Sequence, residues 1–333
     1  MPQTSQKQAL FVGIDIGGTK ILAAVATSDG RILARAKKKT LPKDASFPLG
    51  PTWLSERIVE TAKAAMQKAG LTAKAIRAVG VGAPGPTDIH SGRVLTAVNL
   101  PGWQDGFDLG PTLSEALNIP VYVDNDVNVG LLGEHVFGAA QGLSDVVGLF
   151  VGTGLGGAMI LNGQLRRGFR WSAGEVGHTY LYWPGQQPMD IEKIASRGAI
   201  SRQLTSILNR GESPILEAIV SQRSDRRITS GVIRRALAAG DPATQRAIAQ
   251  AQEAIAVLIA SIANFLDPQA FVLGGGLVES LGESFLAPIR EQAYPLFFVR
   301  HRVEEVQLLP AALGDDAGVL GAVALAMSLS REQ

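Results

Sequence analysis

Residues 121–128 hold the side chains best suited to chemistry. A β-branched and aromatic run ends there in three polar residues, Asp124, Asn125 and Asp126, and a helical pattern follows from Val127. This order predicts a strand that leads directly into a helix, with two carboxylates and an amide beside the free N–H groups of the helix start. In open α/β sheets ligands bind at this edge, so the stretch is a candidate binding site for a polar ligand.

The same residues allow two simpler interpretations. A carboxylate or amide in front of a helix can cap the first N–H groups and do nothing else. A calcium-binding loop is the second alternative, although its glycine comes one place late, at Gly130, and its closing position holds His135 in place of a glutamate. The residues on either side of the stretch favour ligand binding.

Glycine-rich turns follow several of the predicted strands. Residues 17–20, Gly-Gly-Thr-Lys, join two strands, and residues 152–157 form a similar turn before a hairpin at Asn162 and Gly163. A P-loop and a dinucleotide-binding loop both continue into a helix, so neither motif fits these turns. The backbone N–H groups of a glycine hairpin, with Thr19 and Lys20 as further donors, are suited to holding phosphates.

The predicted elements repeat in the two halves of the chain. Each half runs through a glycine-tipped hairpin, a long helix, a buried strand and a further glycine turn. The long helices are predicted over residues 52–70 and 245–266. We therefore expect two α/β lobes, residues 1–124 and 125–333, and a last helix at about residues 315–330 that could pack back on the first lobe.

The composition excludes several classes of protein. The 333 residues are 46% hydrophobic, and 31 Lys and Arg against 30 Asp and Glu leave a formal charge of +1, which makes no electrostatic case for nucleic acid or an anionic membrane. The absence of cysteine rules out disulfides, thiolate zinc sites and cysteine nucleophiles. We see no apolar run of membrane-spanning length, so we expect a cytoplasmic protein without membrane contact.

Five motifs together resemble the ROK family of bacterial sugar kinases and sugar-responsive repressors. They occupy residues 13–20, 82–85, 124–128, 152–157 and 173–178, and the resemblance extends over about residues 10–325. It implies an α/β, two-lobed actin-like ATPase (ribonuclease H-like) fold, with a ligand cleft between the lobes and the sugar-binding loops of the first lobe within residues 1–124.

The resemblance also implies a role for particular residues. Asp126 corresponds to the general base that takes the proton of a sugar hydroxyl as it attacks the γ-phosphate of ATP. Asp15 would face Mg²⁺ directly or through water. The sugar ligands would be Asn125, Glu175, His178 and Glu192, with Asn99 as a further candidate. The nucleotide would be held by Gly17, Gly18, Thr19 and Lys20, by Thr153, Gly154 and Gly156, and by Gly274, Gly275 and Gly276.

One part of the family pattern is missing. Most members follow the histidine with cysteines that hold a structural zinc, and this chain has none to offer, so we expect no zinc site. His178 must then be oriented by another group, for which Gln186, Gln187 and Asp190 are the candidates by location. Zinc-free members include glucokinases that use polyphosphate, so the phosphoryl donor stays open.

The sequence thus predicts an ATP- and Mg²⁺-dependent hexose kinase, with glucose as the first candidate substrate. Mannose, fructose or N-acetylmannosamine are alternatives, and polyphosphate is an alternative donor. A sugar-sensing repressor is disfavoured, because only about ten residues precede the first strand, too few for a helix-turn-helix. A non-catalytic actin-like protein would have no use for the sugar ligands. By analogy with the family, we expect a homodimer.

Overall fold

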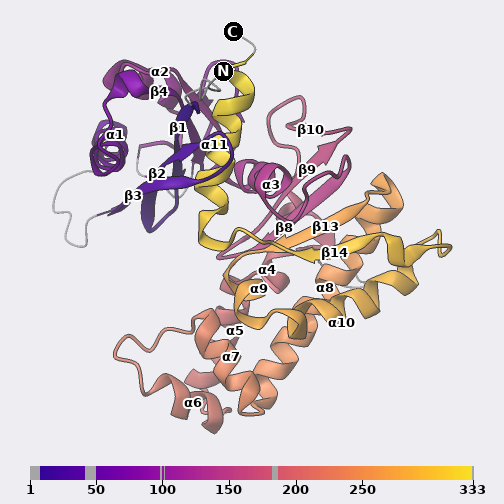
Figure 1. Ribbon diagram of the computed structural model, residues 1–333. Coiled ribbons are helices and arrows are strands. Elements are labelled where there is room, and N and C mark those ends of the chain that lie inside the picture. Colours follow the sequence, from indigo (N-terminus) through magenta and orange to yellow (C-terminus); the bar gives the residue numbers. More distant parts are fainter. Residues whose placement is uncertain (1–7, 42–49, 98–99, 101, 182–186, 332–333) are drawn as a thin grey trace, which may run out of the picture. The chain divides into compact units, whose positions relative to one another are not determined.

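Figure 1 shows the computed structural model, which describes residues 8–41, 50–97, 100, 102–181 and 187–331. The chain divides into two compact units. Unit 1 consists of Met1–Gly142, Leu165–Ala173 and Asp315–Gln333, and unit 2 consists of Leu143–Gln164 and Gly174–Gly314. Each unit is organised around a five-stranded sheet and a hydrophobic core.

Unit 1 has a sheet of strand order β3-β2-β1-β4-β7. The first three strands form an antiparallel meander, and β4 and β7 extend the sheet in parallel with β1. The strands are β1 (Leu10–Ile16), β2 (Lys20–Thr27), β3 (Ile32–Lys39), β4 (Ile76–Ala83) and β7 (Val121–Asn125), with a separate short pair of β5 (Thr87–Asp88) and β6 (Arg93–Val94). The helices are α1 (Pro51–Lys68), α2 (Leu109–Leu117), α3 (Asp126–Phe137) and α11 (Ala317–Leu329).

The two faces of this sheet are covered by different helices. Along β1, Val12, Ile14 and Ile16 join the core that includes the apolar faces of α1 and α2. The residues between them point to the other face, where Gly13 and Asp15 lie against α11. The period of two in β1 therefore sends its carboxylate to the side of the sheet that α3 and α11 cover.

Backbone contacts hold α11 in place. A methyl group at Gly13, Gly80 or Gly321 would overlap the carbonyl oxygen of Val319, Ala322 or Val129 respectively, so β1, β4 and α3 all approach α11 at glycine distance. Figure 1 shows α11, in yellow, lying beside α3 and across the strands of this unit.

Unit 2 repeats the plan with a sheet of order β10-β9-β8-β13-β14. Again an antiparallel meander is extended by two parallel strands, β13 and β14. The strands are β8 (Val146–Val151), β9 (Leu155–Leu161), β10 (Gln164–Leu165), β13 (Ala270–Gly274) and β14 (Gln307–Pro310), with a short pair of β11 (Tyr180–Leu181) and β12 (Met189–Asp190). The helices are α4 (Glu192–Ala195), α5 (Arg197–Asn209), α6 (Pro214–Val220), α7 (Ser230–Ala238), α8 (Pro242–Leu266), α9 (Gly276–Leu281) and α10 (Glu283–Ala293). In the two units together, single 3₁₀ turns occupy Ala73–Ala75, Val176–His178, Tyr294–Leu296, Val303–Glu305 and Gly314–Asp316.

Helix α8 corrects one expectation from the sequence. It is 25 residues long and, by length and composition alone, apolar enough to cross a membrane, so a run of spanning length does exist. However, 56% of its most apolar stretch is buried inside the protein, and α8 packs against α4, α5, α7 and α10 of the same unit. A buried core helix passes the same length test, so α8 is weak support for membrane insertion.

The units also differ from the predicted lobes. Residues 125–142 belong to unit 1, because α3 continues from β7 and packs on β4 and α11. The last helix belongs to unit 1 as well, through its contacts with β1 and β4. The predicted boundary between residues 124 and 125 thus falls inside unit 1, at the junction of β7 and α3.

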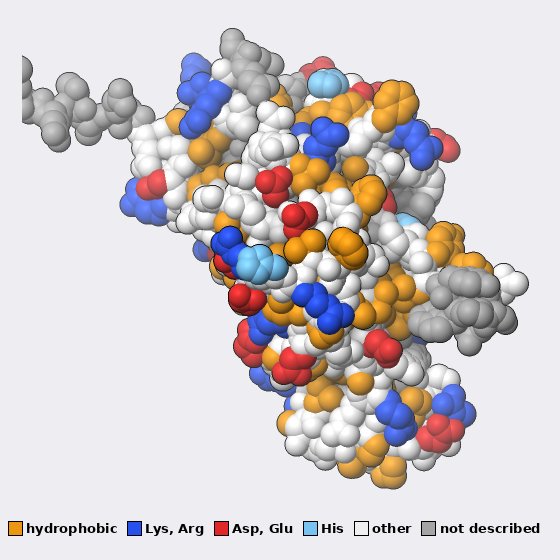
Figure 2. All heavy atoms as spheres, turned by 90° about the vertical axis from the view of Figure 1, so that its right-hand side faces the viewer, with side chains coloured by type: hydrophobic (Ala, Val, Ile, Leu, Met, Phe, Trp, Pro, Cys, Tyr) orange, Lys and Arg blue, Asp and Glu red, His pale blue; other side chains and the backbone are white. Residues whose placement is uncertain are grey.

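Charged side chains of both signs are mixed on the protein surface. On the face shown in Figure 2, Lys and Arg side chains alternate with Asp and Glu side chains. This mixing agrees with the near balance of the whole chain, which has a formal charge of +1.

The contact between β4 and α11 yields a stability prediction. Gly80→Ala places a methyl group on the carbonyl oxygen of Ala322, and neither backbone can yield without moving the helix. We expect the free energy of unfolding to fall by about 3 kcal/mol, at the upper end for overpacking. Denaturant titration of the variant measures the loss.

The matched control is Gly231→Ala in α7, where the added methyl group meets only ordinary contacts. This variant should be neutral or slightly stabilising, because alanine is the better helix former. Equal stability of the two variants would contradict the close approach of α11 to β4.

Candidate active site

The junction of β7 and α3 is organised by Asn125. Its side-chain oxygen accepts hydrogen bonds from the N–H groups of Val127 (2.9 Å) and Asn128 (3.1 Å), and its amide donates to the oxygen of Gly85 (3.2 Å) and to Asp126 Oδ1 (3.1 Å). The capping interpretation therefore holds for Asn125, whose side chain makes these four bonds within unit 1. Its predicted role as a sugar ligand would require it to exchange one of them.

Asp126 is the first residue of α3 and is partly exposed. Its Oδ1 atom accepts hydrogen bonds from the Val127 N–H (2.9 Å) and from the Asn125 amide. Both donors and the helix N-terminus stabilise the charged form of this carboxylate. A charged carboxylate held in a fixed position is what a proton acceptor requires.

Asp124 has a structural role that the sequence did not reveal. The carboxylate is 1% exposed and pairs with Arg167, with Nε 2.7 Å from Oδ2. Its other oxygen accepts from the Asn125 N–H (2.7 Å) and from the Asn128 side-chain amide (3.1 Å). A buried carboxylate needs such partners, and here they fix the turn that presents Asp126.

The first glycine turn brings together Asp15, Lys20 and Asp315 of unit 1. Lys20 Nζ lies 3.0 Å from Asp315 Oδ1, and Asp15 packs against Gly318 at the start of α11. Burial raises the pKa of Asp15 to about 6, an effect that Lys20 opposes and Asp315 reinforces. The hydrogen bond from Lys20 holds the pKa of Asp315 below its usual value.

The chemistry of this cluster suits a magnesium ion and phosphate. Among the described residues no group of three His, Asp or Glu side chains could hold a metal ion alone. Magnesium commonly takes one or two carboxylates and completes its shell with phosphates and water, which Asp15 with Asp315 can match. At Gly18, in the turn itself, a side chain would meet nothing within 4 Å, so the backbone faces open space on that side. Thr19 is exposed beside it.

The second glycine turn, in unit 2, is shorter than predicted. It comprises Gly152, Thr153 and Gly154, because β9 already begins at Leu155, so Gly156 lies within a strand. Arg197 at the start of α5 donates to Thr153 Oγ1 (2.9 Å), and its own N–H donates to the oxygen of Gly152 (3.0 Å). No motif in the sequence pointed to this arginine.

Glu192 lies against the same turn. Its Oε2 accepts a hydrogen bond from the N–H of Leu155 (2.8 Å), and a methyl group at Gly154 would overlap that oxygen. A methyl group at Gly177, in the 3₁₀ turn that leads to His178, would lie 3.3 Å from Glu192 Cβ. Unit 2 therefore brings Glu192 next to both the turn and the segment that carries Glu175 and His178, which are both exposed.

Asp190 is the group found near His178. The pKa of Asp190 is lowered mainly by its hydrogen bond with Lys193, and the charge of His178 contributes in the same direction. Asp190 also pairs with Tyr180 across the short β11–β12 ladder. Gln186 lies outside the described residues, as does the predicted sugar ligand Asn99.

The third glycine turn follows β13. Gly275 has φ +91°, and a methyl group there would lie 2.7 Å from the oxygen of Val151, while one at Gly274 would lie 2.8 Å from the Phe150 ring. The packing of β13 on β8 is therefore sufficient to explain why both positions hold glycine. Gly276 is exposed, and its nearest neighbour would be Ser230 Oγ at 3.6 Å.

A basic cavity of about 700 Å³ lies between the second and third turns of unit 2. Arg197 connects it to Thr153, and Ser230 connects it to Gly276. Arg202, Arg226 and Arg227 also line it. Arg226 is paired with Glu217 (2.9 Å), and the guanidinium groups of Arg197, Arg202 and Arg227 suit an anionic ligand such as a phosphate chain.

Comparison with known proteins assigns the chain to a family. The model of the ROK family matches residues 11–328, and the protein belongs to that family. It is 30% identical to a glucokinase of Halalkalibacterium halodurans over 93% of both chains, and 28% identical to a xylose repressor of Caldicellulosiruptor bescii, over 98% of this chain and 80% of that one.

A solved structure extends the assignment to the fold. The ROK family glucokinase from Streptomyces griseus, in complex with glucose and AMPPNP, is 34% identical, with 96% of this chain and 100% of that chain covered and a TM-score of 0.78. The two-lobed actin-like ATPase fold that the motifs implied is therefore confirmed.

The raised pKa of Asp15 predicts how stability depends on pH. The carboxyl has a pKa of about 6 in the folded protein and 3.8 as a model compound, so between these values the folded state binds more protons than the unfolded chain. Ligand-free protein in chelator should therefore gain stability from this group as the pH falls, by at most about 1.4 kcal/mol per pH unit.

Asp15→Asn removes the pH-dependent contribution of this carboxyl to the free energy of unfolding. The variant should be more stable than the wild type at about pH 7, where the buried charge is costly, and the difference should shrink at about pH 5. Denaturant titrations at both pH values measure it. A difference that does not change with pH would contradict the shifted pKa.

The position of Glu192 changes the expected effect of a substitution in the second turn. From the sequence alone, a side chain at Gly154 would weaken nucleotide binding and spare the sugar. In the structure, Gly154→Ala must push the Glu192 carboxylate away from the Leu155 N–H. We expect both ligands to bind about tenfold more weakly, a loss of one good hydrogen bond to a charged group.

Calorimetric titration with glucose and with AMPPNP separates the two effects. The control is Gly163→Ala, which replaces another glycine of the same β-meander. It lies at a hairpin tip, where nothing is within 4 Å of the added methyl group. Because Gly163 has φ +72°, that variant reports backbone strain without touching Glu192. Unaltered glucose affinity in Gly154→Ala would show that Glu192 does not serve the sugar.

Proposed function

We propose that this sugar kinase transfers the γ-phosphate of ATP to the 6-hydroxyl of glucose in a Mg²⁺-dependent reaction. The observation that carries the proposal is Asp126, a carboxylate that accepts two hydrogen bonds at the start of α3 in a chain of the ROK family. The Halalkalibacterium halodurans relative is a glucokinase, and the Streptomyces griseus structure holds glucose and AMPPNP, which supports glucose and ATP as the two substrates.

Asp126 would take the proton of the sugar hydroxyl as its oxygen forms a bond to the γ-phosphorus. The bond from that phosphorus to the bridging oxygen breaks, and ADP leaves with the electron pair. Phosphoryl transfer depends on alignment and on charge neutralisation, so the remaining residues serve those ends. When bound, Mg²⁺ neutralises charge on the phosphates.

Within each unit, particular residues would bind a substrate. In unit 1, Lys20 and the N–H groups of Gly17 and Gly18 would hold phosphate oxygens, and Asp15 would hold the metal. For Lys20 this requires an exchange of its bond with Asp315, which is exposed and readily solvated. In unit 2, Glu175, His178 and Glu192 would bind sugar hydroxyls, and Thr153 with Arg197 would bind phosphate.

Polyphosphate is a second candidate donor. The basic cavity of unit 2 favours it, because Arg197, Arg202 and Arg227 can pair with successive phosphates of a long anionic chain, whereas a nucleoside carries no charge for them. A longer anionic chain would release more counterions from this cavity and so bind with a steeper dependence on salt. Activity with polyphosphate would add a donor without changing the role of Asp126.

The proposal is tested by a coupled assay in which glucose, mannose, fructose and N-acetylmannosamine are each combined with ATP and with polyphosphate. Asp126→Asn should reduce turnover about 10²- to 10⁴-fold, because the amide cannot accept the proton, while glucose affinity changes little. Asp108→Asn, the same replacement at the exposed N-cap of α2, is the matched control. Turnover of Asp126→Asn at the wild-type level would rule out the base.

A further inference from the structure

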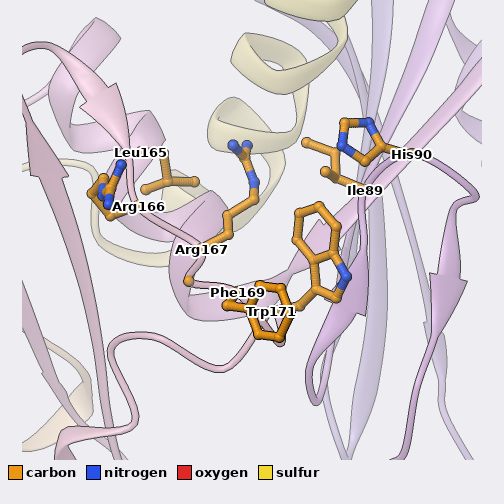
Figure 3. Close-up of a pocket in the computed structure, with 8 residues that line it drawn as sticks. Ile89, His90, Leu165, Arg166, Arg167, Phe169 and Trp171 are labelled. Atoms are coloured by element: carbon orange, nitrogen blue, oxygen red, sulfur yellow. The ribbon is translucent and has the colours of Figure 1, made fainter.

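A second cavity, of about 500 Å³, lies within unit 1. Its walls come from two segments, Ile89 and His90 after β5, and the loop from Leu165 to Trp171 after β10. Figure 3 shows Trp171 between Arg167 and the wall formed by Ile89 and His90, with Phe169 next to Trp171. Its volume is within the range of about 300–1,000 Å³ that small-ligand pockets occupy.

The aromatic side chains of this cavity do not stabilise the core. Phe169 is 99% exposed. Trp171 has φ +60°, a left-handed conformation that a bulky residue seldom adopts, and its ring meets His90 edge-on with centroids 5.2 Å apart. A strained backbone that holds an aromatic ring at the rim of a cavity points to a ligand.

The loop that carries the rings is held firmly. The N–H of Ala173 donates to the oxygen of Arg167 (3.0 Å), closing the loop on itself. Gly168 has φ +78°, and a methyl group there would lie 2.9 Å from Ala173 Cβ, so the turn accepts only glycine without strain. The rings are therefore presented by a preorganised loop, which lowers the entropy cost of binding.

Both walls of the cavity are tied to the turn that presents Asp126. Arg167 lines the cavity and is paired with the buried Asp124 at 2.7 Å. On the other wall, Ile89 and His90 follow the segment of Gly85, whose oxygen accepts the Asn125 amide at 3.2 Å. The cavity thus adjoins the β7–α3 junction inside unit 1, where α3 begins with Asp126.

The lining of the cavity favours a ring with an apolar face. Arg167 is paired with Asp124, and most of the remaining surface is apolar, from Ile89, Leu165, Phe169 and Trp171, with the exposed Arg166 as a further cation. Aromatic faces pack against the C–H faces of sugar or aryl rings, while Arg167 and His90 can donate N–H groups to hydroxyls. A ring with an apolar face and a polar edge meets both requirements.

We propose that Ile89, His90, Arg167, Phe169 and Trp171 form an aromatic subsite that binds a second ring joined to the acceptor sugar. The enzyme then phosphorylates two-ring glucosides, such as a disaccharide or an aryl glucoside, as well as the monosaccharide. This inference rests on the proposed kinase function, because the first ring must reach Asp126.

The test compares kcat/KM for glucose, cellobiose and phenyl β-glucoside. Phe169→Ala and Trp171→Ala should lower the value for both two-ring acceptors about tenfold, mostly through KM, the loss expected for one or two aromatic contacts. Glucose, which leaves the subsite empty, should change by less than about twofold. Trp171→Phe, which keeps a ring, should restore most of the two-ring activity.

Phe298→Ala is the matched control, because Phe298 is 90% exposed in unit 2 and lies outside the cavity. Equal losses for glucose and the two-ring acceptors would overturn the subsite, as would wild-type enzyme that phosphorylates glucose alone. Thermal unfolding of each variant reports whether a general loss reflects poor folding.

A binding measurement separates this inference from the kinase proposal. If the wild type phosphorylates no sugar, the proposed function fails, and calorimetric titration with cellobiose then decides the subsite. Binding that Trp171→Ala weakens and Phe298→Ala does not would uphold it. Absence of cellobiose binding to the wild type would overturn it.

Discussion

The position of α11 is the constraint on which unit 1 depends. Three glycines allow β1, β4 and α3 to approach its backbone more closely than any side chain permits. Because α11 begins beside Asp15 and packs along α3, it fixes the carboxylate of the first glycine turn and the helix that begins with Asp126. Two parts of the candidate site are thereby held by one rigid element, which reduces the freedom that a catalytic arrangement must lose.

Electrostatics then sets the two carboxylates apart. Asp126 accepts two hydrogen bonds at a helix start and is partly exposed, whereas burial raises the pKa of Asp15 to about 6. A nearby cation stabilises the charged form of a carboxyl whose pKa is raised by burial, so Asp15 is suited to a metal ion. The free energy that the charged Asp15 costs without a ligand would be recovered when such an ion binds. Because Asp15 and Asp126 are both aspartates, the difference between their surroundings comes from their positions at the edge of the sheet.

Local patterns in the sequence predicted most of the fold. The pattern of residues 121–128 correctly predicted a strand, β7, that leads directly into a helix, α3, and the glycine hairpins correctly excluded the P-loop and dinucleotide folds. The Asn125 cap was also visible as a possibility. These features depend on residues a few positions apart, where periodicity and turn chemistry are informative.

The remaining features depend on residues far apart in the chain. Lys20 and Asp315 are separated by 295 positions, and Asp124 and Arg167 by 43. Neither pair has a local signature, because an exposed arginine or aspartate in a loop is ordinary until its partner is known. The α3 boundary was misplaced for the same reason, since only packing on α11 assigns the helix to unit 1.

Assigning one separate role to each residue is misleading at Glu192. Family resemblance made it a sugar ligand and Gly154 a phosphate ligand, as two separate assignments. In unit 2 the carboxylate of Glu192 accepts the Leu155 N–H and fills the space beside Gly154, so the shape of the turn and the position of the carboxylate depend on each other. A ligand that moves one must move the other, and by linkage the coupling between two such ligands is reciprocal. Under the proposed function the glycine is needed twice, for the approach of a phosphate on one side and of a carboxylate on the other.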